Sequence, residues 1–304
     1  MNTRPSRSGP DARTGRLRAT AVGAVAIPIW SSLAALAQLN GGVPPLQLLA
    51  VSFAIAGTIG LVYLLWSGVP LSSLLDVPPG AWLLGVGGLF GYHLLYFLAF
   101  RMAPALEVNL VNYLWPLLIV LFSALPVAGA GGLTWRHLAG AAMGFAGTAL
   151  ILTGVTASET GGHLAGYLCA MGAAIIWAAY SVLSRRYASV PSHAVAGYCL
   201  VTAALAAASH LVLETTLWPQ GAAQWAVLAA MGAGPVGLAF YFWDHGVKHG
   251  DVRFLGVACY AIPLLSTLLL IVLGLGEASA GLWVACGLIV GGAGLAARSV
   301  GEGD

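Results

Sequence analysis

The feature of this sequence that most constrains its fold is a series of long apolar runs separated by short connections rich in glycine and proline. A helix that spans a bilayer needs about 20 mostly apolar residues. Charged residues make up only 7% of the chain, whereas a soluble domain carries about 25% to keep its surface hydrated. The sequence therefore predicts an all-α integral membrane protein with ten transmembrane helices and no soluble domain. The expected spans cover residues 19–39, 45–67, 81–101, 106–127, 134–154, 163–185, 192–213, 222–247, 252–274 and 279–297.

Lysine and arginine residues predict the orientation of these spans, because cytoplasmic loops of membrane proteins carry an excess of both. If the N-terminus is cytoplasmic, ten spans place every one of the 12 basic residues except Arg101 on the cytoplasmic side. An odd number of spans would scatter them over both sides. We therefore expect both termini in the cytoplasm, as a basic tail at 1–18 and a short tail at 299–304.

The two halves of the chain resemble each other when one is shifted along the other without gaps. The shift that places Trp30 on Trp177 also places Pro116 on Pro263. The same shift aligns Tyr96 with Trp243, Arg101 with Lys248 and Tyr113 with Tyr260. Five helices per copy reverse the orientation of the second copy, and such inverted repeats are typical of secondary transporters, whose substrate binds between the halves. The predicted repeats are residues 19–155 and 163–298.

The first apolar run also has features of a cleaved signal peptide. Arginines precede it, and it ends in Ala35-Leu36-Ala37, which resembles a cleavage site. Because this segment has a partner in the second half of the chain, we interpret it as a retained helix.

Two prolines at matched positions predict kinks in the fourth and ninth helices. Pro116 has no backbone N–H, so the carbonyl of Asn112 loses its helical partner. Asn112, Tyr113 and Pro116 share one face, and in a bilayer the freed carbonyl has to meet protein, water or substrate. Pro263, preceded by Tyr260, repeats the arrangement. The pair predicts hinges beside a shared central site, with a purely structural kink as the alternative.

Polar and aromatic side chains in other spans also indicate a central cavity. Tyr92, His93 and Tyr96 lie within one arc of the third helix, and a histidine in mid-membrane is costly unless it faces a cavity or a partner. Trp177 and Tyr180 share a face of the sixth helix, well inside the span. Aromatic belts at the membrane interface therefore do not explain these rings. Packing in the core or against lipid is the alternative to a substrate site.

Charged side chains inside the expected spans are few. Glu107 lies close to Arg101 near the outer end of the fourth helix. Asp244 precedes Lys248 by one turn in the eighth helix, where an i,i+4 ion pair is expected. We assign structural or gating roles to these four residues. A phosphorylated substrate would need Lys or Arg in the cavity, whereas a zwitterion needs only helix ends, amides and hydroxyls.

Several other functions are not expected. A net charge of +2 gives no case for a nucleic-acid partner, and the four isolated cysteines predict neither a disulfide nor a metal site. We find no catalytic constellation and no cofactor motif, so neither an enzyme nor a bound cofactor is predicted. The expected partners are a small-molecule substrate and the lipid bilayer. Gly140-x-x-x-Gly144 and Gly287-x-x-x-Gly291 predict close helix packing between the repeats or in a homodimer, and a monomer is equally compatible.

Three motifs resemble those of a known family. They are Glu107 to Pro116 (EVNLVNYLWP), Ile176 to Tyr180 (IWAAY) and Trp243 to Asp251 (WDHGVKHGD). Together with the inverted repeats, they make the chain similar, from about residue 19 onward, to YddG-type aromatic amino acid exporters in the EamA-like branch of the drug/metabolite transporter superfamily.

This resemblance implies export of phenylalanine, tyrosine and tryptophan across a bacterial inner membrane, with tolerance for other amino acids and some cationic drugs. It also implies a central cavity between the repeats. Carried over to this chain, the cavity residues are Trp30, Tyr92, His93, Tyr96, Asn112, Tyr113, Trp115, Trp177, Tyr180, Trp243 and Tyr260.

The expected mechanism is alternating access, with the halves rocking about Pro116 and Pro263. The family pattern has a carboxylate where this chain has His93, so we expect facilitated diffusion, or weak proton coupling through His93, rather than tight ion coupling. The alternatives are a multidrug exporter of organic cations and, from a different class, an intramembrane enzyme or a non-transporting membrane protein.

Overall fold

The computed structural model describes residues 10–39, 42–125, 134–153, 163–274 and 280–297, and all regular structure within them is helical. The helices of the first half are α1 (Pro10–Ala24), α2 (Ala26–Ser31), α3 (Leu33–Gln38), α4 (Pro45–Trp66), η1 (Leu71–Leu74), α5 (Pro79–Val86), η2 (Gly87–Gly91), α6 (Tyr92–Met102), α7 (Ala105–Asn112), α8 (Trp115–Phe122) and α9 (Trp135–Thr153). Those of the second half are α10 (Leu164–Leu183), η4 (Ser184–Tyr187), η5 (Ser192–Ala194), α11 (Val195–Leu213), α12 (Ala222–Ala233), η6 (Gly234–Leu238), α13 (Ala239–His249), α14 (Val252–Ala258), α15 (Ala261–Val272) and α16 (Ala280–Ala297).

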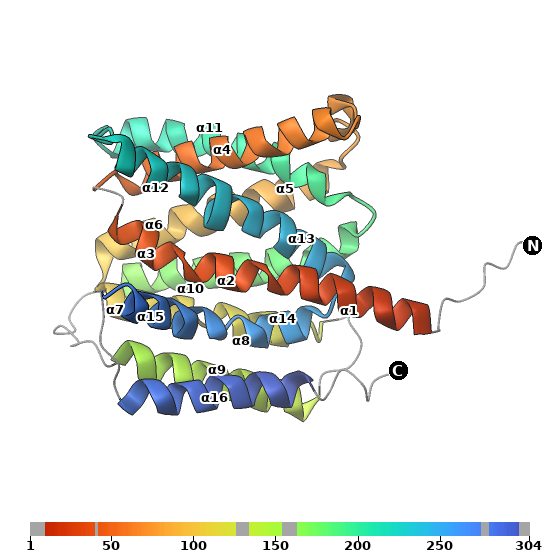
Figure 1. Ribbon diagram of the computed structural model, residues 1–304, viewed down its shortest axis with the longest axis vertical. Helices are drawn as coiled ribbons and strands as arrows, with labels where there is room; N and C mark the ends of the chain where they lie inside the picture. The colour runs from red at the N-terminus through yellow and green to blue at the C-terminus, as the bar shows by residue number, and fades with distance from the viewer. Residues whose placement is uncertain (1–9, 40–41, 126–133, 154–162, 275–279, 298–304) are drawn as a thin grey trace, which may run out of the picture.

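The long helices run alongside one another in a bundle, with their connections at its two ends (Figure 1). The start of α1 and the end of α16 lie at the same end of the bundle, on the right in Figure 1. The junctions between α10 and α11 and between α13 and α14 lie there too. We refer to this as the N-terminal end, and to the other as the opposite end.

Helix interruptions recur at matched positions in the two halves. The π-helical turn η2 joins α5 to α6, and the π-helical turn η6 joins α12 to α13 at the positions given by the internal shift. The helix also breaks between α7 and α8, just before Pro116, and between α14 and α15, just before Pro263. The two breaks lie where the prolines predict kinks, because neither proline can donate a hydrogen bond to the preceding turn.

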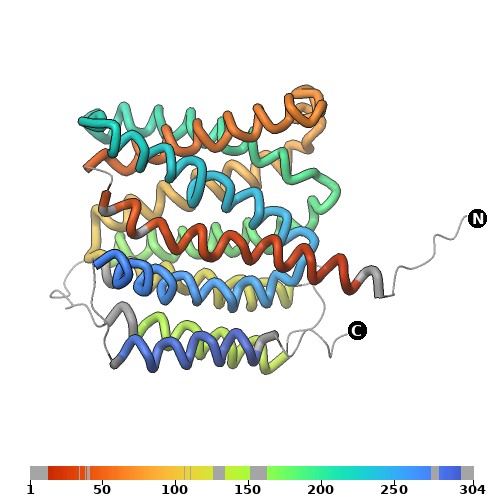
Figure 2. The backbone as a smooth tube through the Cα atoms, in the orientation of Figure 1, coloured from red at the N-terminus to blue at the C-terminus, as the bar shows by residue number. Residues whose placement is uncertain are grey.

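The closest helix pairs each join one half of the chain to the other. The most extensive pairs are α9 with α16, α4 with α11, α10 with α6, and α1 with α13. Figure 2 shows the first two pairs at opposite edges of the bundle. Close approach needs small residues: a Cβ added to Gly246 of α13 would overlap the backbone of Gly23 in α1.

Glycines also explain how α9 meets its neighbours. The carbonyl of Gly140 lies where a Cβ on Gly292 of α16 would be, and Gly144 faces the ring of Tyr260. A Cβ on Gly287 would meet nothing within 4 Å in the described part of the chain. On α16, Gly292 makes this contact, and a Cβ on the predicted Gly291 would also meet α9, at Met143. The predicted homodimer contact through Gly287 and Gly291 stays a prediction.

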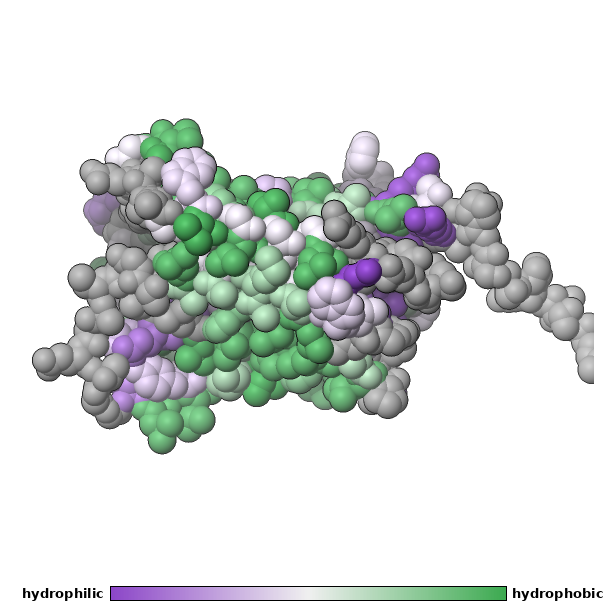
Figure 3. Space-filling model, turned by 90° about the horizontal axis from the view of Figure 1, so that it is seen from below, coloured by the Kyte–Doolittle hydropathy of each residue, from purple (hydrophilic) through white to green (hydrophobic). Residues whose placement is uncertain are grey.

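Within the described ranges, seven helices are long and apolar enough to cross a membrane, namely Arg13–Ala37, Pro45–Trp66, Pro79–Met102, Leu164–Tyr187, Ser192–Leu213, Ala222–His249 and Val252–Val272. The face seen in Figure 3 is hydrophobic across its middle and carries hydrophilic side chains toward its two ends. The chain is therefore an all-helical membrane protein. The expected count of ten spans and the cytoplasmic position of both termini stay predictions.

Candidate functional site

A cavity of about 600 Å³ is lined by residues of both halves, among them residues of α3 and of the start of α4. These two segments lie at the opposite end of the bundle (Figure 1). The cavity wall is formed by α2, α3, α4, α6, α7, α8, α10, α12, η6, α13 and α15 together with Val43 and Tyr113. Most of the residues expected at a central site reach this wall. They are Trp30, Tyr92, His93, Tyr96, Asn112, Tyr113, Trp115, Trp177 and Pro263.

Tryptophan rings form the floor of the cavity, toward the N-terminal end. Trp30 of α2 meets Trp177 of α10 edge-on, with ring centroids 5.8 Å apart. Trp243 of α13 lies 5.2 Å from Trp30 and 6.3 Å from Trp177. Trp115 of α8 meets the rings of both Trp177 and Trp243 edge-on. Rings from both halves therefore separate the cavity from the N-terminal end.

Paired tyrosines and asparagines form a polar wall between α6 and α7. Tyr92 and Tyr96 stack with their ring centroids 5.6 Å apart. The hydroxyl of Tyr96 donates to Oδ1 of Asn109 at 2.6 Å, and Nδ2 of Asn112 donates to the hydroxyl of Tyr92 at 3.2 Å. The helical spacing of each pair puts both contacts on the face that each helix turns toward the other.

His93 faces the same cavity from α6, next to the π-helical turn η2. Its Nδ1 lies 2.6 Å from the carbonyl oxygen of Leu89, so Nδ1 carries the proton and donates to that oxygen. Its ring packs edge-on against Phe53, with centroids 5.3 Å apart. In the neutral ring, Nε2 is then a hydrogen-bond acceptor.

Three of the residues expected at the cavity do not reach its wall. Trp243 is fully buried on the side of the tryptophan floor that faces away from the cavity, and its Nε1 donates to Oγ of Ser181 at 3.0 Å. Tyr180 packs over Gly88 of η2, and Tyr260 packs over Gly144 of α9. Each is drawn away from the cavity by a glycine or hydroxyl on a neighbouring helix. Pro116 is buried beside Gly256 and does not reach the wall.

Comparison with known families decides what kind of protein has this architecture. The model of the EamA-like transporter family matches residues 18–153 and again residues 164–298. The chain belongs to the EamA-like transporter family. It is therefore an integral membrane transporter and not an enzyme, in agreement with the resemblance described from the sequence.

This transporter is similar over most of its length to proteins named aromatic amino acid exporter YddG. The one from Ancylobacter novellus is 51% identical, over 92% of this chain and 97% of the relative. Those from Salmonella typhimurium and Escherichia coli are 29% and 27% identical, over 83% and 91% of this chain and 87% and 96% of the relatives. A crystal structure of a protein 50% identical to it superposes with a TM-score of 0.88, over 94% of this chain and 99% of that chain.

The cavity of the transporter also includes residues that were not expected. Phe97, Phe100 and Phe240 add rings, while Ser266 and Thr267 add hydroxyls on α15. The sequence carried a partial signal for them, because Phe100 follows Tyr96 by one turn and Thr267 follows Pro263 by one turn. The end of α3 and the start of α4 line the cavity near its mouth and gave no such signal.

The charged residues singled out from the sequence lie away from the cavity. Glu107 accepts a hydrogen bond from the hydroxyl of Tyr167 on α10, while Arg101 is exposed on α6. Asp244 and Lys248 form the expected i,i+4 ion pair at 2.8 Å, and Lys248 also donates to the carbonyl of Val190. Glu107 thus contacts α10, and Lys248 links α13 to the segment after η4.

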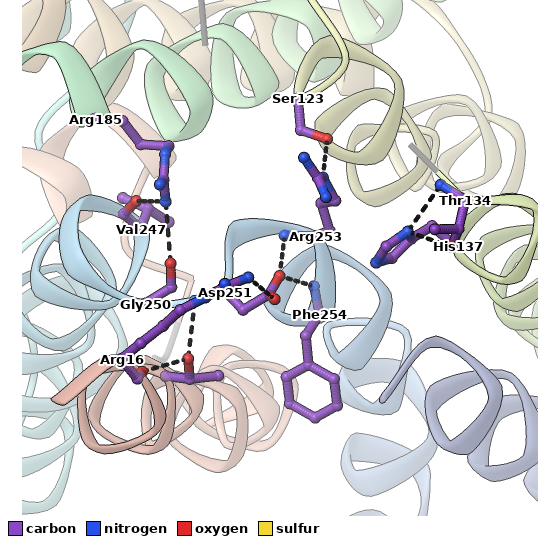
Figure 4. A network of polar contacts seen from close by, with 11 residues as sticks. Arg16, Ser123, Thr134, His137, Arg185, Val247, Gly250, Asp251, Arg253 and Phe254 are labelled. Carbon is purple, nitrogen blue, oxygen red and sulfur yellow. Dashed lines mark hydrogen bonds and ion pairs between the residues drawn. The ribbon is translucent and has the colours of Figure 1, made fainter. Parts of the chain in front are cut away.

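A polar network closes the N-terminal end of the transporter (Figure 4). Arg16 of α1 donates to the carboxylate of Asp251 at 2.6 Å, and the backbone N–H of Asp251 donates to the hydroxyl of Thr20. Arg253 of α14 donates to Ser123 after α8, and Arg185 of η4 donates to backbone carbonyls at and near the end of α13. Segments from both halves are thus tied together below the tryptophan floor.

Asp251 stays ionised within this network. Burial alone would raise its pKa, but the N–H of Phe254 and the guanidinium of Arg16 both favour the carboxylate, so that its pKa lies below the usual value. Asp251 also caps the N-terminus of α14, where it accepts from the N–H groups of Arg253 and Phe254.

Proposed function

We propose that this transporter exports aromatic amino acids across the bacterial inner membrane. The observation that carries the proposal is a cavity between the two halves whose wall is built from aromatic rings and, in the described part of the chain, contains no Asp, Glu, Lys or Arg. Ring faces suit an aromatic side chain, and amide, hydroxyl and imidazole groups suit a zwitterion. Three relatives bear the name of aromatic amino acid exporters, which supports the same substrate class.

Counterflow in proteoliposomes tests this substrate class. Vesicles loaded with unlabelled tryptophan, phenylalanine or tyrosine should accumulate labelled tryptophan, and vesicles loaded with aspartate or lysine should accumulate far less. An equal response to every loaded amino acid, or none to the aromatic ones, would contradict the proposal.

The topology that we propose has ten spans, two inverted repeats at 19–155 and 163–298, and both termini in the cytoplasm. Support comes from the matched interruptions, from the helix pairs between halves and from the two family matches. Arg16, Arg185, Lys248 and Arg253 gather at the N-terminal end, as the excess of basic residues on the cytoplasmic side requires. The cavity then opens outward, and alternating access requires the network at the N-terminal end to separate.

Cysteine labelling tests this orientation. Asp76 and Gln220 are exposed in connections at opposite ends of the bundle. In a background without the native cysteines, a membrane-impermeant maleimide added to intact cells should label Gln220→Cys and leave Asp76→Cys unlabelled until the cells are lysed. Labelling of both from outside would rule out the topology.

For energy coupling we propose facilitated diffusion or weak proton coupling through His93. The cavity wall has no carboxylate among its described residues, and His93 is its titratable imidazole. An imposed pH gradient should change the initial rate of tryptophan counterflow by less than about threefold. Strict dependence on the gradient would show tight coupling instead.

Export of organic cations is the second candidate, because the faces of Trp30, Trp177 and Phe240 can attract an ammonium group. Competition against labelled tryptophan separates the two candidates. Under the second candidate, a quaternary ammonium compound should compete more strongly than phenylalanine.

A further inference from the structure

Several donors of the cavity wall are already used within the protein. Among them are four whose N–H or O–H groups point at oxygen atoms of the wall or of the adjacent backbone. The pairs are Trp30 with the carbonyl of Pro235 at 3.0 Å, Tyr96 with Asn109 at 2.6 Å, Thr267 with the carbonyl of Pro263 at 2.8 Å and His93 with the carbonyl of Leu89 at 2.6 Å. These four groups are therefore not available to donate to a substrate.

Among the described residues that line the cavity, one buried hydrogen-bond acceptor has no partner. Asn112 is 3% exposed, and its Oδ1 is buried with no hydrogen-bond partner there, although the side chain lines the cavity. Nδ2 of the same amide donates to the hydroxyl of Tyr92, which leaves Oδ1 as the amide atom without a partner. Asn109, one turn away on the same helix, differs in this respect, because its Oδ1 accepts from Tyr96. Buried polar atoms are normally satisfied, so an orphan acceptor at a binding cavity indicates a donor on the ligand.

His93 adds a second acceptor on the same side of the cavity. Its ring centroid lies 5.0 Å from that of Tyr92, the residue to which Asn112 donates. Because Nδ1 donates to Leu89, the lone pair of the neutral ring is on Nε2.

We propose that Oδ1 of Asn112, assisted by Nε2 of His93, binds the ammonium group of the substrate, and that the cavity therefore accepts aryl-alkyl amines that lack a carboxylate. This inference rests on the proposed function and names the recognition chemistry of the same site. A charged donor strengthens a hydrogen bond to a neutral acceptor, and the rings around it favour a cation. The described wall offers no cationic side chain to a carboxylate, so an aryl acid that lacks the amine binds poorly.

Three indole compounds test the proposal in the competition assay. Tryptophan carries both charged groups, tryptamine only the ammonium group, and indole-3-propionate only the carboxylate. We expect tryptamine to inhibit counterflow within about threefold of tryptophan, and indole-3-propionate to be weaker by about tenfold or more, the factor that one charge-assisted hydrogen bond supplies. Equal inhibition by the amine and the acid, or stronger inhibition by the acid, overturns the proposal.

Variants test whether the preference for the amine over the acid depends on Oδ1 of Asn112. Asn112→Leu should weaken the binding of tryptophan and tryptamine about tenfold and the binding of indole-3-propionate much less. The ratio of amine to acid affinity should therefore fall. Asn112→Asp keeps an oxygen at that position and should retain or increase the preference. Asn109→Leu is the matched change at an asparagine whose oxygen already has a partner, and it should leave the ratio of amine to acid affinity unchanged. An unchanged ratio in Asn112→Leu refutes the assignment.

Failure of this inference can be told apart from failure of the proposed function. If no aromatic amino acid is transported, the proposed function fails, and calorimetric titration of the purified transporter with tryptamine and indole-3-propionate still reports the preference. If tryptamine binds in that titration and indole-3-propionate does not, the inference is supported even though the proposed function has failed. If tryptophan is transported and the acid binds as well as the amine, only the inference fails.

Discussion

Single glycines decide where several aromatic side chains of this transporter lie. A Cβ on Gly88 would overlap the ring of Tyr180, and a Cβ on Gly144 would overlap the ring of Tyr260. Both tyrosines are therefore buried in spaces that the absence of a side chain on a neighbouring helix leaves open. A methyl or isopropyl group at either glycine would force the ring and its helix to move.

We expect Gly144→Val to lower the stability of the purified transporter. Overpacking of a filled site costs about 1–3 kcal/mol, and here the ring of Tyr260 sits against the break between α14 and α15. Thermal unfolding in detergent measures the change. Gly287→Val on α16 is the control, because a Cβ there meets nothing within 4 Å in the described residues. Equal losses for both variants would contradict this account.

Trp177 is the floor residue whose loss should affect transport most. It contacts Trp30, Phe240 and Trp243, so Trp177→Ala opens a hole between the cavity and the N-terminal end. We expect the KM for tryptophan counterflow to rise about tenfold or more, because a large aromatic contact is lost, and Trp177→Phe to restore part of it. Trp66→Ala, at an exposed tryptophan of α4, should have little effect.

The sequence predicts which residue types surround the cavity better than it predicts which of them reach its wall. Trp30, Tyr92, His93 and Asn112 could be found because polar and aromatic groups deep in a membrane helix require a partner. Tyr180 could not be excluded, because its position depends on a glycine of another helix that is far away in sequence. Tertiary contacts of this kind leave no periodic signal.

At the scale of helices, the interruptions have two different origins. Prolines cause the breaks before Pro116 and Pro263, and these were predictable because the missing N–H acts locally. The π-helical turns at Gly87–Gly91 and Gly234–Leu238 were not predicted, because a glycine-rich apolar stretch keeps the same hydropathy in either helical form. Their recurrence at matched positions in both halves indicates that they are a regular part of the fold.

The break before Pro263 should control turnover more than binding. Pro263→Ala restores an N–H that can reach the carbonyl of Cys259, so α14 and α15 can join into a straighter helix. We expect the maximal rate of counterflow to fall several-fold, with a smaller change in KM. Pro70→Ala, in an exposed connection outside the spans, serves as the control and should change neither. A pure KM effect would show that Pro263 shapes the cavity instead.

For the whole molecule, the network around Asp251 should make stability depend on pH. The folded-state pKa of Asp251 lies below the usual value of about 3.9, so the unfolded chain binds a proton more readily than the folded one. Its contribution is therefore complete above about pH 5 and is lost as the pH falls through the folded-state pKa. Thermal unfolding between pH 7 and pH 3 should show this loss.

Asp251→Asn provides the comparison for that pH series. It should be less stable at pH 7 by about 1–3 kcal/mol, because the charge-assisted contact with Arg16 and part of the helix cap are lost. It should also lose less stability on acidification than the native chain. Asp76→Asn, at an exposed position, should follow the native curve. Identical acid sensitivity of Asp251→Asn and the native chain would exclude Asp251 as the source.

Hydropathy predicted the membrane class and the internal repeat predicted the two-fold organisation, because both are properties summed over long stretches of chain, while three short motifs carried the resemblance to the family. They did not predict the network at the N-terminal end. Arg16, Ser123, Arg185 and Asp251 lie far apart in the sequence, and each reads on its own as an ordinary polar residue at a helix end. Only packing of the two halves brings them together.

The tryptophan floor and the layer around Asp251 lie one behind the other toward the N-terminal end, because Trp177 precedes Arg185 and Trp243 precedes Asp251 along segments that run to that end (Figure 1). Water that enters the cavity from the opposite end reaches the tryptophan floor first and the polar network around Asp251 second. A membrane that holds many copies of this protein in this state can therefore keep its voltage and its proton gradient. Leakage would require both barriers to fail at once.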